Sequence, residues 1–143
     1  MVESLFDIKD IKEFNKRVHN GEPINIKDPE NGSPLLQYVI FYEHDEKFKT
    51  LIEAGVDPNG TDRVGYGPLS LAIAVGRIDY VKSLLKAGSN INHTDIYSRS
   101  TPLTRAIDEC RIDIIKLLVK NGASLTKKIK TSEWSGEEYV RWV

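Results

Sequence analysis

The sequence has little of what secreted, membrane and nucleic-acid-binding proteins commonly depend on. Its single cysteine, Cys110, cannot form an internal disulfide, so we expect a reducing, cytoplasmic location. No apolar run approaches about twenty residues and no apolar leader follows Met1, which predicts neither a membrane span nor a secretory signal. Lysine and arginine (20) nearly balance aspartate and glutamate (21). Nucleic-acid binders usually carry a basic face, so this balance argues against nucleic acid as a partner.

Residue combinations that hold metals or phosphates are also missing. The chain has three histidines, and no two of them have metal-ligand spacing on a helix: His19, His44 and His93. Gly65-Tyr66-Gly67 is rich in glycine, yet it lacks the lysine and the spacing of a phosphate-binding loop. We therefore expect no metal and no cofactor.

Two groups of residues could carry catalysis, and in both cases a structural interpretation is preferred. Cys110 could be a nucleophile or redox thiol, but free cysteine often behaves as a small hydrophobic residue, here in a half-buried turn. Asp108, Glu109 and Asp113 could form an acid/base pair, but solvated carboxylates at helix ends are commoner. The sequence therefore predicts no catalytic residues and no enzyme.

What the sequence does contain is an internal repeat. Pro34, Pro68 and Pro102 are 34 residues apart, and each is followed by leucine. A glycine follows each proline after about twenty residues, in a similar context: Gly55, Gly88 and Gly122. A repeat of this length predicts a stack in which each unit buries its apolar faces against its neighbours.

Each unit is predicted to be a helix, a turn, a second helix and a loop. Proline is favoured at the first helical position, so Pro68 marks a helix start, and Gly76 breaks that helix. Ser33 and Thr101 precede the other two prolines and should cap the first turn. Gly88 ends the second helix. The inward side chains of this unit are Leu69, Ala72, Ile73, Val81, Leu84 and Leu85.

This pattern resembles the ankyrin repeat. Residues 65–92 carry Gly-Pro-Leu-Ser-Leu-Ala and, later, Leu-Leu-Lys-Ala-Gly, close to the Thr-Pro-Leu-His-x-Ala signature of that family. Residues 101–123 are a second good copy, and neither copy has the signature histidine. The copy at 28–59 is weaker. It places Tyr38 where a small alanine is expected and has one extra residue near 42–45.

The resemblance implies a single all-α domain, an ankyrin-repeat solenoid of about four helix pairs and a C-terminal helical cap. Leu5, Phe6 and the stripe from Ile11 to Val18 are expected to form a diverged N-terminal capping repeat. Ser135 to Glu138 resembles a capping box that opens the final helix. The expected units are residues 1–27 (N-terminal cap), 28–61, 62–95 and 96–128 (repeats) and 129–143 (C-terminal cap).

In ankyrin proteins the hairpin tips and the first helix of each pair line a concave, partner-binding face. Position by position, the resemblance implies these binding residues: Arg63, Val64, Tyr66, Tyr97, Ser98, Phe41, Val75, Asp108 and Glu109. Tyrosine, phenylalanine and arginine are enriched at interfaces. Two alternatives stay open for Ile40 and Phe41, the core or the groove, and the same holds for Trp134.

The sequence therefore predicts a monomeric, non-catalytic module that binds a partner protein. Its length leaves little room for a second domain, which favours an inhibitor, such as the immunity protein of a cognate toxin, over an adaptor or scaffold. An enzyme or a small-molecule sensor is the least favoured alternative. A basic cluster is interpreted as a solvated helix face rather than a site for an acidic partner: Lys116, Lys120, Lys127, Lys128 and Lys130.

Overall fold

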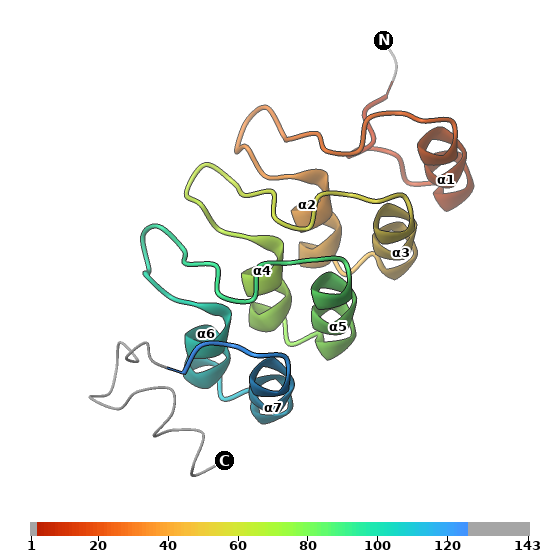
Figure 1. The fold of residues 1–143 in the computed structure, drawn as a ribbon. Coiled ribbons are helices and arrows are strands. Elements are labelled where there is room, and N and C mark those ends of the chain that lie inside the picture. The colour runs from red at the N-terminus through yellow and green to blue at the C-terminus, as the bar shows by residue number, and fades with distance from the viewer. Residues whose placement is uncertain (1–2, 126–143) are drawn as a thin grey trace.

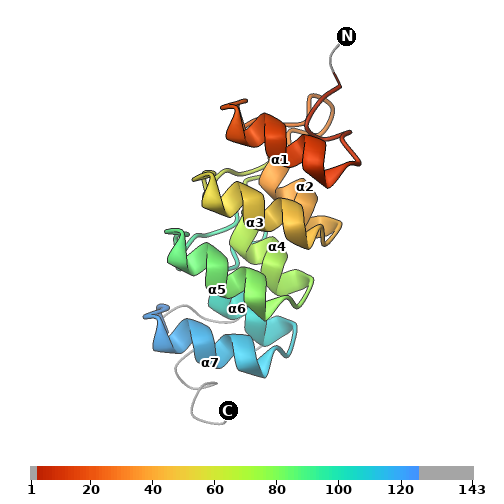
Figure 2. The ribbon, with the colours of Figure 1, turned by 90° about the vertical axis from the view of Figure 1, so that its right-hand side faces the viewer.

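The computed structural model describes residues 3–125, which form an all-α stack of helix pairs (Figure 1). The helices are α1 (Ile11–His19), α2 (Leu35–Phe41), α3 (Asp45–Glu53), α4 (Pro68–Ala74), α5 (Ile78–Lys86), α6 (Pro102–Asp108) and α7 (Ile112–Lys120). Figure 2 shows α1, α3, α5 and α7 side by side as one layer, with α2, α4 and α6 behind them. Residues 3–125 contain no strand, so the predicted helical solenoid is confirmed.

The N-terminal unit has one helix where two amphipathic stripes had suggested a pair. Leu5 and Phe6 lie in a turn, because the Ser4 carbonyl accepts from Asp7 N–H and the Ser4 hydroxyl accepts from Phe6 N–H. Helix α1 begins only after Asp10, whose carboxylate caps Lys12 N–H. The described residues thus hold three helix pairs and the single α1. The predicted C-terminal cap, 129–143, lies outside them, as do Trp134 and the three lysines after Leu125.

The first pair begins one residue later than its proline suggests. Pro68 and Pro102 are the first residues of α4 and α6, as predicted, but Pro34 is the N-cap of α2 and Leu35 its first residue. Ser33 therefore precedes the N-cap, and α2 has no side-chain cap, so that prediction was wrong. Thr101 does cap α6. Its hydroxyl accepts from the backbone N–H of Thr104, and the Thr104 hydroxyl accepts in return from Thr101 N–H.

This shift also changes which residue of the first pair is equivalent to the alanines of the other two pairs. Val39, fully buried, lies where Ala72 and Ala106 lie in the other pairs, and Tyr38 is half-buried beside it. The prediction that Tyr38 replaces the alanine was therefore wrong. The two helices of each pair start ten residues apart in all three pairs. The extra residue predicted near 42–45 is thus absent from that turn.

The difference in length lies in the hairpin-shaped loops that precede α2, α4 and α6. Each loop is closed by a backbone hydrogen bond and ends in a left-handed residue: Asp28–Gly32, Asp62–Gly65 and Asp95–Arg99. The middle loop is one residue shorter, so helix starts are 33 residues apart in the first step and 34 in the second. The equal spacing of the prolines arises because Pro34 lies outside its helix.

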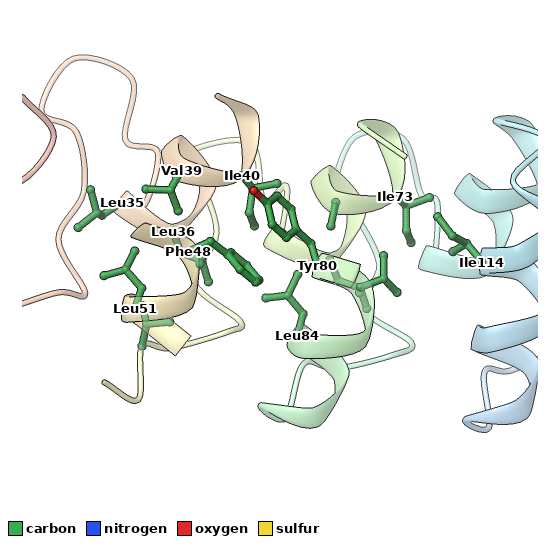
Figure 3. Close-up of a cluster of buried hydrophobic side chains, with 14 of the residues drawn as sticks. Leu35, Leu36, Val39, Ile40, Phe48, Leu51, Ile73, Tyr80, Leu84 and Ile114 are labelled. Carbon is green, nitrogen blue, oxygen red and sulfur yellow. The ribbon is translucent and has the colours of Figure 1, made fainter. Parts of the chain in front are cut away.

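Apolar side chains from neighbouring pairs fill the space between the two layers (Figure 3). Leu84 of α5 has no exposed surface and lies toward Phe48 and Leu51 of the preceding pair. The rings of Phe48 and Tyr80 stack with centroids 4.1 Å apart. Each pair is therefore stabilised by its neighbours rather than by a core of its own.

A polar network joins the first and second pairs at the edge of this core. The Arg77 guanidinium donates to Asp79 (2.7 Å) and Asp45 (2.8 Å), and it lies 4.2 Å from the ring centroid of Tyr80. The Tyr80 hydroxyl also donates to Asp45. These hydrogen bonds, from Tyr80 first and then Arg77, lower the pKa of Asp45 below its ordinary value.

Replacing Leu84 with alanine should lower the free energy of unfolding by about 2–5 kcal/mol, because it leaves a cavity between two pairs. Equilibrium denaturant unfolding measures the loss. Ile112→Ala is the matched control, since that side chain is 48% exposed on α7 and should cost less than about 0.5 kcal/mol. A loss below about 1 kcal/mol for Leu84→Ala would show that this helix face is misplaced.

Stability should fall with acid partly through Asp45. A carboxylate with a lowered folded pKa stabilises the fold above its unfolded pKa of about 4, and that contribution fades as pH falls through the folded value. The Asp45 side chain is 63% exposed, so we expect Asp45→Asn to cost no more than about 1 kcal/mol at neutral pH. Denaturant titrations from neutral pH downward should show wild type and variant converging. A difference that stays constant into strong acid would contradict this role.

Candidate binding surface

The loops and the first helices share one side of the stack. In Figure 1 the three hairpins project beside α2, α4 and α6, on the side away from α3, α5 and α7. We call this side the hairpin surface. It comprises the hairpins Asp28–Gly32, Asp62–Gly65 and Asp95–Arg99, the residues flanking them, and the exposed sides of α2, α4 and α6 with their following residues.

The chemistry of the hairpin surface changes along the stack. Three equivalent positions on each first helix and its C-cap face this side, and they read Tyr38, Phe41 and Tyr42; then Leu71, Ala74 and Val75; then Arg105, Asp108 and Glu109. The first set is aromatic, the second is aliphatic and the third is charged. The surface therefore has an aromatic end at α2 and an acidic end at α6.

Most of the residues expected to bind a partner are exposed on this surface. Phe41, Val64 and Tyr97 have exposed fractions of 61%, 48% and 76%. Asp108 and Glu109 are exposed as well. Val75 and Ser98 are half-buried, and the Ser98 hydroxyl donates to Asp95. Ile40, by contrast, is fully buried in the core, which settles the two alternatives left open for Ile40 and Phe41.

Two exposed apolar residues of this surface were missed from the sequence. Tyr42 is 55% exposed after α2, and Ile96 is 65% exposed at the third hairpin. Tyr42 was hidden by the one-residue shift of the first pair, which makes it the equivalent of Val75. Ile96 covers Gly65 of the preceding hairpin, where an added Cβ would lie 2.5 Å from the Ile96 Cδ1. Sequence spacing carried no indication of that contact.

Arg63 makes its hydrogen bonds within the protein. Its guanidinium donates to the carbonyls of Glu30 (2.8 Å) and Pro29 (2.9 Å) in the preceding hairpin. Its side chain also covers Gly32, where an added Cβ would lie 2.6 Å from the Arg63 Cγ. Arg63 therefore joins two hairpins, and a change at this position would disturb the surface as well as any contact with a partner.

Tyr66 is likewise held within the stack. It is half-buried, its hydroxyl donates to the Ser70 carbonyl (3.3 Å), and burial raises its pKa. The guanidinium carbon of Arg105 lies 4.9 Å from the Tyr66 ring centroid. The same guanidinium approaches the buried carboxylate of Asp95 at 3.3 Å. Tyr66 and Asp95 thus hold an internal arginine between a ring and a carboxylate.

A hollow of about 420 Å³ lies on the hairpin surface between α2 and the first two hairpins. We call it the aromatic hollow, and its lining includes the residues Phe6, Tyr38, Phe41, Tyr42, Asp28 and Asp62. The Phe6 ring meets Tyr38 edge-on, with centroids 5.5 Å apart. Aromatic rings and two carboxylates therefore line the same space.

A larger hollow, about 590 Å³, lies between α3 and α5 on the other side of the stack. Phe48 and Tyr80 form its base, and several charged side chains surround it. Its carboxylates Asp45 and Asp79 are already paired with Arg77. Arg77 thus engages both carboxylates, and its bond to Asp45 joins two helix pairs.

Cys110 lies in the turn between α6 and α7, whereas His93 precedes the third hairpin, with its Nε2 3.8 Å from the Asp95 carboxylate. Cys110 is exposed, rather than half-buried as expected, and its backbone is left-handed (φ 53°), as Gly76 is at the equivalent turn. His93 is half-buried, with Nε2 3.0 Å from the Gly65 carbonyl, so it is not a free surface residue. Histidine, cysteine and acidic residues form no cluster of three suited to a metal in this part of the chain.

Within the same residues, none of the seven helices is both long and apolar enough to cross a bilayer.

Comparison with known proteins agrees with the stacked pairs described above. A family model for ankyrin repeats, in three copies, matches residues 7–95. That match spans α1 to α5, and α6 and α7 repeat the same geometry beyond it. A search of curated proteins gave no significant match. Because the family model covers more than half of the 143 residues, the chain belongs to the ankyrin repeat family.

Proposed function

We propose that this chain is a non-catalytic module that binds a partner protein through the concave hairpin surface. Ankyrin repeats are generally protein–protein interaction modules, which supports the coarse function. The observation that carries the location is the distribution of exposed apolar side chains. Of the six large ones in residues 3–125, five lie on the hairpin surface: Phe41, Tyr42, Val64, Ile96 and Tyr97.

Physical chemistry favours an interface at such a surface. Exposed apolar side chains gathered on one side of a soluble domain usually mark a contact site. Tyr42 and Tyr97 belong to the residue types that dominate binding energy when they become buried. Neither side chain has a core-packing role that would explain its type. Burial against a partner would remove this apolar area from water, which is favourable.

The partner's identity and the biological role go beyond the family. We propose an inhibitor, including the immunity protein of a toxin, as the first role, with an adaptor in a larger complex as the alternative. A monomeric, cytoplasmic protein is part of the same proposal. Identification of the captured partner separates these roles, because an antidote binds a toxin and an adaptor binds subunits of an assembly.

Changing Phe41 and Tyr97 together to alanine should weaken the partner complex more than tenfold, a loss above about 1.4 kcal/mol. Both side chains are exposed, so the folded state should keep its stability. The partner is captured from a lysate of the source cells with the immobilised full chain and identified by mass spectrometry. Its affinity for each variant is then measured by calorimetry.

Ile112→Ala is the matched control, because it removes an exposed apolar side chain from α7, outside the hairpin surface. It should bind like wild type. Equal partner affinity for wild type and for the Phe41/Tyr97 variant would exclude the hairpin surface as the interface. Thermal unfolding of each variant checks that lost binding does not reflect a lost fold.

A further inference from the structure

The aromatic hollow has walls that can accept a cation. The rings of Phe41 and Tyr42 are nearly perpendicular (84°), with centroids 5.1 Å apart, and both side chains are mostly exposed. The Tyr38 ring is tilted against Tyr42 at 4.7 Å. The π face of an aromatic ring is electron-rich and attracts ammonium and guanidinium groups within about 6 Å. In this T-shaped contact the edge of one ring meets a face of the other, and the His44 ring stacks on Tyr42 at 6.0 Å. The exposed parts of the Phe41 and Tyr42 rings remain open to a cation.

Two carboxylates complete this environment. Asp28 Oδ1 accepts from the backbone N–H groups of Glu30 (2.8 Å) and Asn31 (3.0 Å), which fix its orientation. Asp62 Oδ1 accepts in the same way from Val64 (3.0 Å) and Tyr66 (2.9 Å). Among residues 3–125, neither carboxylate has an ion-pair partner.

The cations nearest in sequence to these carboxylates are used elsewhere. The Lys27 ammonium donates to the carbonyl of Thr61 (2.8 Å). Arg63 donates to the two carbonyls of the first hairpin described above. Both positive groups therefore hold hairpins together, and the charges of Asp28 and Asp62 are left without a cation from their own loops.

In the part of the chain that the structure describes, the third hairpin has an ion pair at its aspartate, and the first two hairpins do not. There the hairpin aspartate, Asp95, is paired with Arg105, whose guanidinium also lies over the Tyr66 ring. The equivalent helix positions in the first and second pairs are Tyr38 and Leu71, which carry no charge. Within residues 3–125 an arginine lies between a ring and a hairpin carboxylate at the third hairpin, and none does so at the aromatic hollow.

We propose that the aromatic hollow binds a basic side chain, arginine or lysine, of the partner protein, between the rings of Tyr38, Phe41 and Tyr42 and the carboxylates of Asp28 and Asp62. This deepens the proposed function, on which it rests. A neutral apolar side chain would fit the rings but would leave two carboxylates desolvated beside it, which is unfavourable. A basic side chain satisfies both kinds of lining at once.

The probe is an acetylated, amidated Gly-Arg-Gly tripeptide, titrated into the full isotope-labelled chain and followed by amide NMR. Shifts should concentrate at the N–H groups that bond to the two carboxylates: Glu30, Asn31, Val64 and Tyr66. The same peptide with citrulline, a neutral isostere of arginine, should bind at least tenfold more weakly. A norleucine peptide should also bind more weakly. Equal affinity for the citrulline or norleucine peptide, or shifts elsewhere on the chain, would overturn the proposal.

The variant Asp28→Asn/Asp62→Asn removes both charges and keeps the Oδ1 acceptors of the hairpins. It should weaken the arginine peptide at least tenfold. Asp57→Asn is the matched control, because Asp57 makes the same local bond, accepting from Asn59 N–H (2.9 Å), outside the aromatic hollow. Wild-type affinity in the double variant would contradict the proposal.

A second variant covers the case in which the double variant does not fold. Tyr42→Leu keeps an apolar side chain but removes a π face, and it should weaken the arginine peptide about two- to fivefold, as expected for one cation–π contact at an exposed site. Ile112→Ala, which removes an exposed apolar side chain outside the hairpin surface, is its control and should bind like wild type. Unchanged binding in Tyr42→Leu would count against recognition by the rings.

The two proposals fail differently. Loss of the captured partner in the Phe41/Tyr97 variant, combined with no preference for the arginine peptide over citrulline, would overturn only the basic-residue inference. Preference for arginine at the aromatic hollow, combined with equal partner affinity for wild type and the Phe41/Tyr97 variant, would overturn the proposed interface. It would also exclude the partner as the source of the basic side chain, while the hollow's own selectivity for arginine would stand. Both results can be read with the full chain and the same set of folded variants.

Discussion

Burial between neighbouring helix pairs is the constraint on which this structure depends. A pair of short helices has too little apolar surface to form a core alone, so each pair must cover the next. Leu84, Phe48 and Tyr80 meet across such a junction, and the network of Arg77 and Asp45 closes its edge. Both layers of helices bury their facing sides in these contacts. The hairpins and the exposed sides of α2, α4 and α6 are not needed for that burial, so their side chains can differ from unit to unit.

The hairpin surface nevertheless carries structural duties of its own. Arg63 and Ile96 each cover the left-handed glycine of the preceding hairpin, and Arg105 joins its hairpin aspartate to a tyrosine of the previous unit. These contacts hold successive loops in register. Residue type alone therefore does not identify a binding residue here. Tyr66 packs within the stack, whereas Tyr97, a residue of the same type, is exposed.

The sequence predicted the parts of the fold that depend on local chemistry. Pro68 and Pro102 begin helices, Thr101 caps one, and Leu84 is buried, because these roles follow from the residue and its near neighbours. The register of the first pair could not be read this way. A hairpin shortened by one residue and the position of Pro34 outside its helix offset each other, and the prolines stayed evenly spaced. Among the candidate site residues, Val64 and Tyr97 are exposed as expected, and Phe41, left open between core and groove, is exposed too. The contact of Arg63 with the first hairpin and that of Arg105 with Tyr66 join different units, so the local sequence does not indicate them.

The change from aromatic side chains on α2 to acidic ones on α6 gives the hairpin surface a direction. A peptide segment lying along the stack meets rings at one end and the carboxylates of Asp108 and Glu109 at the other. The same segment laid in reverse would meet these groups in the opposite order. A peptide bound along this surface would therefore make different contacts when reversed, an asymmetry that a surface of identical repeats would lack.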